Sequence, residues 1–140
     1  MPRSDPFTVR FHPRIEARIA QIAKETKRSK SAVVEELVDE AERTRRFPGI
    51  AFNGPDWSRR AWVMGTALDV WQIIEAWQDY DEDGERMLSN SHLTERQLKI
   101  ALAYYREFAQ EIDEAVAGNR RSLDELRSDF PFIEVFESPD

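Results

Sequence analysis

The chain has 140 residues, 41% of them hydrophobic and none of them cysteine, so one compact domain or two small ones can form without disulfides or thiolate metal sites. No charged-then-apolar leader and no apolar run long enough to span a bilayer is present, so we expect a soluble cytoplasmic protein with no membrane partner. The net charge of −7 is uneven: residues 1–60 carry 13 Lys and Arg against 9 Asp and Glu, whereas residues 61–140 carry 7 against 18. The negative total therefore does not exclude nucleic-acid binding by the first part, and the acidic second part suits a basic protein partner.

Residues 7–11 have the pattern of a short β-strand. Phe7, Val9 and Phe11 alternate with Thr8 and Arg10, which is the period of two expected when one face of a strand is buried. Helical spacing follows directly, so this strand has no obvious partner in its own chain. We therefore expect an antiparallel ribbon with a second copy of the chain, which makes the protein a homodimer.

Two helices should follow the strand. Pro13 suits a first helical position, and Ile15, Ile19, Ile22 and Ala23 then share one face of a helix that ends near Thr26. Ser29 is a good N-cap for a second helix. The apolar face of that second helix comprises Val33, Val34, Leu37, Val38 and Ala41.

This order of alternating strand, proline-led helix, basic turn and capped helix resembles a ribbon-helix-helix DNA-binding domain, from Phe7 to about Arg45. In that family the outward strand side chains read base edges, which implies Thr8 and Arg10 here, with Arg10 suited to guanine. The N-terminus of the second helix holds a phosphate. The residues implied in phosphate binding are Lys27, Arg28, Ser29, Lys30 and Ser31, and Arg3 and His12 are further candidates for DNA contacts. The alternative is that Thr8 and Arg10 are only the solvent face of a dimerisation strand.

The sequence Phe47-Pro48-Gly49 ends the second helix and marks a domain boundary. Residues 50–52 and 61–63 are expected to form a hairpin-like element, followed by a helix that buries Val70, Ile73, Ile74 and Trp77. A short helix should cover residues 85–88. Thr94 and Gln97 form a capping box for the next helix, with a stripe of Leu98, Ala101, Leu102 and Tyr105. A last helix is expected from Glu111 to about Ala117, with Ile112 and Val116 in the core and a break at Gly118-Asn119.

The segments RRAWVMGTALDVWQII and HLTERQLKIALAYY resemble a small helical domain of unknown function that occurs in antitoxin-like bacterial proteins, from about Phe47 to Asp113. Members of that family are often encoded beside a PIN-like nuclease toxin, so the resemblance implies a VapB-type antitoxin. The helices also resemble a helix-turn-helix arrangement with the helix after Thr94 in the recognition position. Because this part is acidic, we expect that helix to pack or dimerise rather than to touch DNA.

Sites of other kinds find little support. Asp79, Asp81, Asp83 and Gly84 match the first half of an EF-hand loop, but Asn90 stands where the bidentate Glu is needed, so a solvated acidic turn is the better interpretation. His12 and His92 have no nucleophile or metal-ligand spacing around them. We therefore expect no catalytic residues, no metal, no cofactor and no enzyme activity.

The last segment combines acidic residues with large apolar ones. It could return to the helical domain as an extra strand, or it could order on a partner protein, which we favour because few neighbours lie near it in the chain. An acidic segment also suits a nuclease whose RNA groove is basic. The candidate partner-binding residues are Phe130, Phe132, Ile133, Val135 and Phe136.

The expected fold class is mainly α, with a dimeric ribbon-helix-helix domain at residues 1–46, a helical, helix-turn-helix-like domain with short strands at 47–120, and an acidic, aromatic tail at 121–140. The expected function is that of a type II antitoxin and autorepressor, which binds operator DNA and neutralises a PIN-like ribonuclease toxin. The alternative is a stand-alone ribbon-helix-helix transcriptional regulator, whose second domain senses a ligand or only oligomerises.

Overall fold

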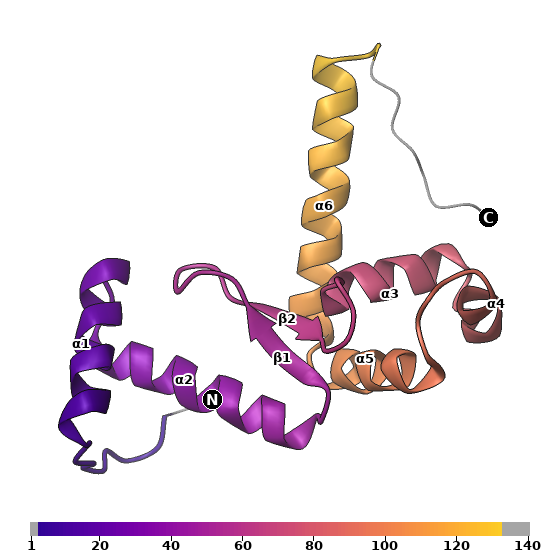
Figure 1. The fold of residues 1–140 in the computed structure, drawn as a ribbon. Helices are drawn as coiled ribbons and strands as arrows, with labels where there is room; N and C mark the ends of the chain where they lie inside the picture. The colour runs from indigo at the N-terminus through magenta and orange to yellow at the C-terminus, as the bar shows by residue number, and fades with distance from the viewer. Residues whose placement is uncertain (1–2, 133–140) are drawn as a thin grey trace. The chain divides into compact units, whose positions relative to one another are not determined.

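The computed structural model describes residues 3–132 and divides the chain into two units, residues 1–41 and 42–140. Within the described residues, the elements are six helices and one two-stranded antiparallel sheet (Figure 1). This confirms the mainly helical fold class with short strands. The division between the units falls inside the second helix, ahead of the boundary expected after residue 46.

The first unit contains α1 (Pro13–Thr26) and the start of α2 (Lys30–Arg46), and both helices begin where the sequence predicts. Residues 3–12 form neither helix nor strand. The strand expected at residues 7–11 is therefore not formed in the single chain. The physical reason is that a strand needs a neighbour for its N–H and C=O groups.

The buried core of the first unit is small. It consists of Ile19, Ile22 and Val33, with Ala23 and Val34 packed against them. Other apolar side chains of this unit that the sequence assigned to buried faces are exposed. They are Phe7, Val9, Phe11, Ile15, Leu37 and Val38.

The second unit begins with a hairpin of β1 (Ile50–Asn53) and β2 (Arg60–Val63), paired from Ile50 opposite Val63 to Asn53 opposite Arg60. This confirms the predicted hairpin. The remaining elements are α3 (Val70–Asp79), α4 (Gly84–Ser89), α5 (Glu95–Glu107) and α6 (Ala109–Asp129). α3 packs against α4, α5, α6 and β2, so it lies at the centre of this unit (Figure 1).

The core of the second unit joins the hairpin to α3 and α5, with Ile50, Ile73 and Tyr104 fully buried. The capping box that starts α5 is present as predicted: Gln97 N–H donates to Thr94 Oγ1 over 3.1 Å and Thr94 N–H donates to Gln97 Oε1 over 2.9 Å. The expected stripe of α5 was wrong in one place. Tyr104, rather than Tyr105, is buried with Leu98 and Ala101, because the buried residues follow a spacing of three.

The expected helix at 111–117 was too short, and the expected break at Gly118-Asn119 does not occur. α6 continues to Asp129, so the boundary expected after residue 120 lies inside a helix. The Asn119 side chain explains the continuation, because its amide donates to the Glu75 carboxylate of α3 over 3.2 and 3.3 Å. Arg120 adds an ion pair with the same carboxylate. These contacts hold the middle of α6 to α3 and offset the helix penalty of Gly118.

Every helix within residues 3–132 is either too short or too polar to span a lipid bilayer.

Candidate nucleic-acid interface

The two predicted base readers, Thr8 and Arg10, lie exposed in the segment without regular structure. The apolar side chains that alternate with them in the sequence are exposed as well, to 84% at Phe7, 51% at Val9 and 37% at Phe11. An isolated chain thus leaves three large apolar side chains in water beside the two polar ones. This pattern fits a segment whose apolar face is covered by something outside the single chain.

His12 anchors the end of this segment to α1. Arg14 N–H donates to His12 Nδ1 over 3.3 Å, and the N–H groups of Ile15 and Glu16 donate to the His12 carbonyl over 2.9 and 3.1 Å. His12 is therefore the N-cap of α1, a role that sequence reasoning missed because histidine is not among the preferred cap residues. Arg3, at the other end of the segment, pairs with Glu35 over 2.8 Å, and both side chains are well exposed.

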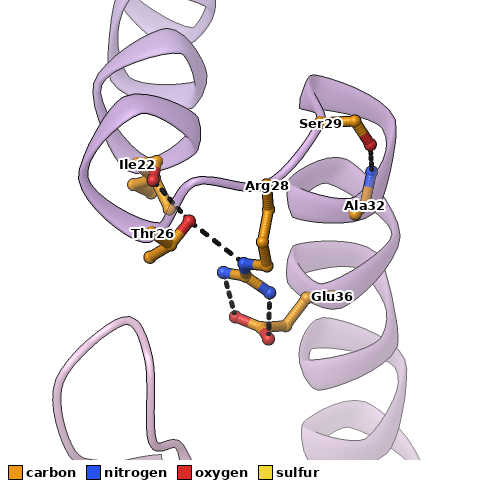
Figure 2. A network of polar contacts seen from close by, with 6 residues as sticks. All are labelled: Ile22, Thr26, Arg28, Ser29, Ala32 and Glu36. Carbon is orange, nitrogen blue, oxygen red and sulfur yellow. Dashed lines mark hydrogen bonds and ion pairs between the residues drawn. The ribbon is translucent and has the colours of Figure 1, made fainter.

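The turn between α1 and α2 carries the remaining residues of the predicted interface. Lys27 adopts the left-handed conformation, with a φ of 54°, and closes α1 through its backbone N–H. Ser29 Oγ accepts from Ala32 N–H over 3.1 Å (Figure 2), which makes Ser29 the N-cap of α2 as predicted. Lys27, Lys30 and Ser31 are exposed.

The Arg28 side chain forms hydrogen bonds with both neighbouring helices. Its guanidinium donates to Glu36 Oε2 over 2.8 Å, to Glu36 Oε1 over 3.4 Å and to Thr26 Oγ1 over 3.0 Å (Figure 2). Thr26 Oγ1 donates in turn to the Ile22 carbonyl over 2.6 Å. We call this chain of contacts from α1 to α2 the Arg28 brace. Sequence reasoning missed it because Glu36 lies eight residues after Arg28, across the start of α2.

The first turn of α2 has the electrostatic character of an anion site. It contains no acidic residue, and Lys30 is the first residue of the helix. Ser29 satisfies the N–H of Ala32, whereas the N–H groups of Lys30 and Ser31 belong to the positions that lack acceptors within a helix. Those N–H groups and the positive end of the helix dipole favour a phosphate oxygen.

The predicted partner-binding residues are described only in part. Phe130 and Phe132 are exposed, to 45% and 81%, and their rings meet edge to face with centroids 6.1 Å apart. Ile133, Val135 and Phe136 lie outside the described residues. The second half of α6, which leads to these rings, extends beyond α3 and α5 (Figure 1).

A polar cluster of the second unit was also missed. Arg43 donates to Tyr104 Oη over 2.7 Å and to Glu111 Oε1 over 2.9 Å, and its guanidinium lies 3.8 Å from the centre of the Phe108 ring. Burial raises the pKa of Tyr104 above its usual range. Burial acts to lower the pKa of Arg43, but the hydrogen bonds to Glu111 and Tyr104 outweigh it and raise that pKa. The cluster ties the last turn of α2 to α5 and α6, so its role is structural.

A cavity of about 520 Å³ lies between the turn after β2, α3, α4 and the start of α5. Leu68, Tyr80, Met87 and Leu93 provide its apolar walls, and Gln97 is among its polar lining. The lining contains no Asp, Glu, Lys or Arg. The cavity therefore suits an uncharged, mainly apolar molecule.

The half-matched EF-hand loop forms a tight turn in which Asp81 and Glu82 have positive φ and Asp83 accepts the N–H of Arg86 to cap α4. Within residues 3–132, no three His, Asp or Glu side chains lie close enough together to hold a metal ion. His92 borders the cavity instead. Comparisons of the chain with known protein families, with curated proteins and with solved structures found no significant match.

Proposed function

We propose that the protein is a type II antitoxin that binds operator DNA as a homodimer, represses its own gene and neutralises a PIN-like ribonuclease toxin by direct binding. The observation that carries the DNA-binding part is the segment at residues 7–11, whose apolar side chains are exposed in the single chain while Thr8 and Arg10 alternate with them. Pairing with the same segment of a second copy would cover Phe7, Val9 and Phe11. It would also satisfy the backbone groups of both segments.

Such a ribbon presents two copies of Thr8 and Arg10 on its uncovered face. A two-stranded ribbon fits the major groove, where Arg10 can donate two hydrogen bonds to guanine O6 and N7. The first turn of α2, with Lys27 and Lys30 beside it, then lies free to hold a phosphate and to set the position of the ribbon. In this arrangement the ribbon determines which DNA sequence is bound, and the first turn of α2 adds affinity that does not depend on sequence.

The toxin-binding part of the proposal is supported by charge and by exposed aromatic rings. Residues 61–140 carry 7 Lys and Arg against 18 Asp and Glu. A ribonuclease must hold RNA in a basic groove, so an acidic partner is attracted to the same surface as its substrate. Phe130 and Phe132 would add apolar anchors, and the mechanism is stoichiometric masking of the nuclease.

The DNA claim can be tested with the segment upstream of the protein's own gene. Arg10→Ala should relax the preference for that segment over unrelated DNA by about tenfold or more, because a bidentate base contact is lost. Lys30→Ala should weaken binding to every sequence alike and make the log–log dependence of affinity on salt shallower by about one. Gel-shift titrations at three salt concentrations measure both effects. Undiminished discrimination in Arg10→Ala would show that the ribbon is not the reader.

The toxin claim has its own experiment. Co-expression with the product of the adjacent gene should yield a stable complex on size-exclusion chromatography, and the complex should lack the ribonuclease activity of the free partner. A clean dimer that binds DNA but retains no partner would contradict the antitoxin proposal and favour the stand-alone regulator.

The cavity of the second unit supports that regulator as a second candidate function, because an uncharged pocket could receive an effector. The test uses 2-naphthol as an uncharged aromatic probe and 2-naphthoate as its charged counterpart. Saturable binding of the former alone, abolished by Ala67→Trp at the cavity lining, together with a change in DNA affinity, would favour the regulator.

A further inference from the structure

The turn between α1 and α2 is held in a conformation that its own residues do not favour. Lys27 has a positive φ, which costs a residue with a Cβ about 1 kcal/mol or more. The N–H of Arg28 reaches back to the Ala23 carbonyl over 3.0 Å, the hydrogen bond that typically closes a helix through a left-handed residue. This backbone hydrogen bond offsets part of the cost, and side-chain contacts can offset the rest.

The Arg28 brace provides those contacts. The planar guanidinium bonds both carboxylate oxygens of Glu36 and the hydroxyl of Thr26, so it joins the last turn of α1 to the second turn of α2 (Figure 2). Arg28 and Glu36 are only 29% and 33% exposed at their side chains. A half-buried, two-pronged ion pair is stronger and more directional than a surface pair.

The same contacts remove Arg28 from the set of groups that can bind a phosphate. A guanidinium that already donates to a carboxylate and a hydroxyl must break those bonds to reach DNA. Lys30, in contrast, is exposed, and its Nζ lies 4.0 Å from Glu16 Oε1, a long contact between two exposed side chains. Arg28 and Lys30, although only two positions apart in sequence, thus have different roles.

We infer that Arg28 is a positioning residue for the DNA-binding site, which acts through Glu36 to hold the first turn of α2 toward a phosphate and does not itself contact DNA. The inference rests on the proposed DNA-binding function and goes beyond it by dividing the basic turn into a contact residue, Lys30, and a positioning pair, Arg28 and Glu36.

Glu36→Gln tests the inference, because the positioning role and simple electrostatics predict opposite changes in DNA affinity. The substitution removes a negative charge near the proposed interface, so electrostatics alone would tighten DNA binding. Loss of the brace predicts the opposite, a weakening of about tenfold, because a charge-assisted pair that fixes the turn is lost. Glu35→Gln is the matched control. It removes the same charge one residue away, where the acid pairs with exposed Arg3, and it should not weaken binding.

The salt dependence of affinity separates positioning from contact. Arg28→Ala should weaken binding about tenfold without changing the log–log salt slope, whereas loss of a phosphate contact would make the slope shallower by about one. Arg28→Lys keeps the charge but loses the planar guanidinium that donates to both carboxylate oxygens of Glu36, so it should weaken binding as Arg28→Ala does. Circular dichroism and sedimentation of each variant verify that helices and dimer are retained.

The outcomes distinguish the two proposals. Tighter binding by Glu36→Gln, a shallower slope for Arg28→Ala, or wild-type affinity in Arg28→Lys would each overturn the positioning role while leaving DNA binding intact. Absence of salt-dependent binding by the wild-type dimer itself would overturn the proposed function, and the positioning role with it.

Discussion

The residues of the α1–α2 turn differ in their structural roles, although three of the four are basic. Lys27 supplies a left-handed backbone, Arg28 bridges two helices, Ser29 caps α2, and Lys30 remains exposed. Composition marks the turn as basic, but only the positions of Thr26 and Glu36 in space decide which charge is available to a ligand.

Lys27→Gly should stabilise the protein and weaken its DNA binding at the same time. Glycine adopts a positive φ without steric cost, so the free energy of unfolding should rise by about 1 kcal/mol. The lost charge should lower affinity for all DNA sequences and make the salt slope shallower. Urea unfolding at fixed protein concentration and gel-shift titration measure the two effects.

Lys24→Gly is the control for this prediction, because Lys24 lies in the last turn of α1 itself. There glycine should cost about 1 kcal/mol. Equal destabilisation by both substitutions would mean that Lys27 does not hold a left-handed conformation in solution.

At the scale of elements, the sequence predicts best where local chemistry decides. The hairpin, the start of α1 at Pro13 and the capping box of α5 follow from neighbouring residues, and all three are present. The length of α6 could not be predicted, because the Gly118-Asn119 pair resembles a break and its stabilising partner Glu75 is in another helix. Which tyrosine of α5 is buried depends likewise on how that helix faces α3.

Gly118→Ala tests whether α6 is continuous. A Cβ at Gly118 would meet Arg121 at 3.8 Å, which is ordinary contact, and alanine favours a helix over glycine by about 0.5–1 kcal/mol. The melting temperature should therefore rise by a few degrees, as read by circular dichroism. A decrease would indicate that the chain breaks here.

Gly54→Ala is the opposing control. Its φ is +106°, and a Cβ there would collide with the carbonyl oxygen of Ser58 in the hairpin loop. This substitution should lower the melting temperature, so the two glycines of the same unit are expected to respond with opposite sign.

At the scale of the whole molecule, the two units differ in the size of their buried cores. Among residues 3–132, the second unit buries a core that includes Ile50, Ile73 and Tyr104, whereas the buried core of the first consists of Ile19, Ile22 and Val33. Three buried side chains are too few to stabilise a domain of about 40 residues, and six large apolar side chains of the same unit remain exposed. The unpaired strand pattern predicts a second copy of the chain, and this stays a prediction, because the register and the area of such an interface do not follow from the residues of one chain.

Val9→Glu tests the second copy directly. In a ribbon dimer the substitution puts two carboxylates, one from each chain, on the buried face, and desolvating them should weaken dimerisation by about a hundredfold or more. Thr8→Glu changes the neighbouring residue on the opposite face, so it should leave the dimer intact while impairing DNA binding by repulsion from phosphates. Sedimentation over a range of protein concentrations distinguishes the two variants. If the unmodified protein sediments as a monomer, or if both variants dissociate alike, Phe7, Val9 and Phe11 do not form the dimer interface and the ribbon, with the DNA contacts it would present, does not exist.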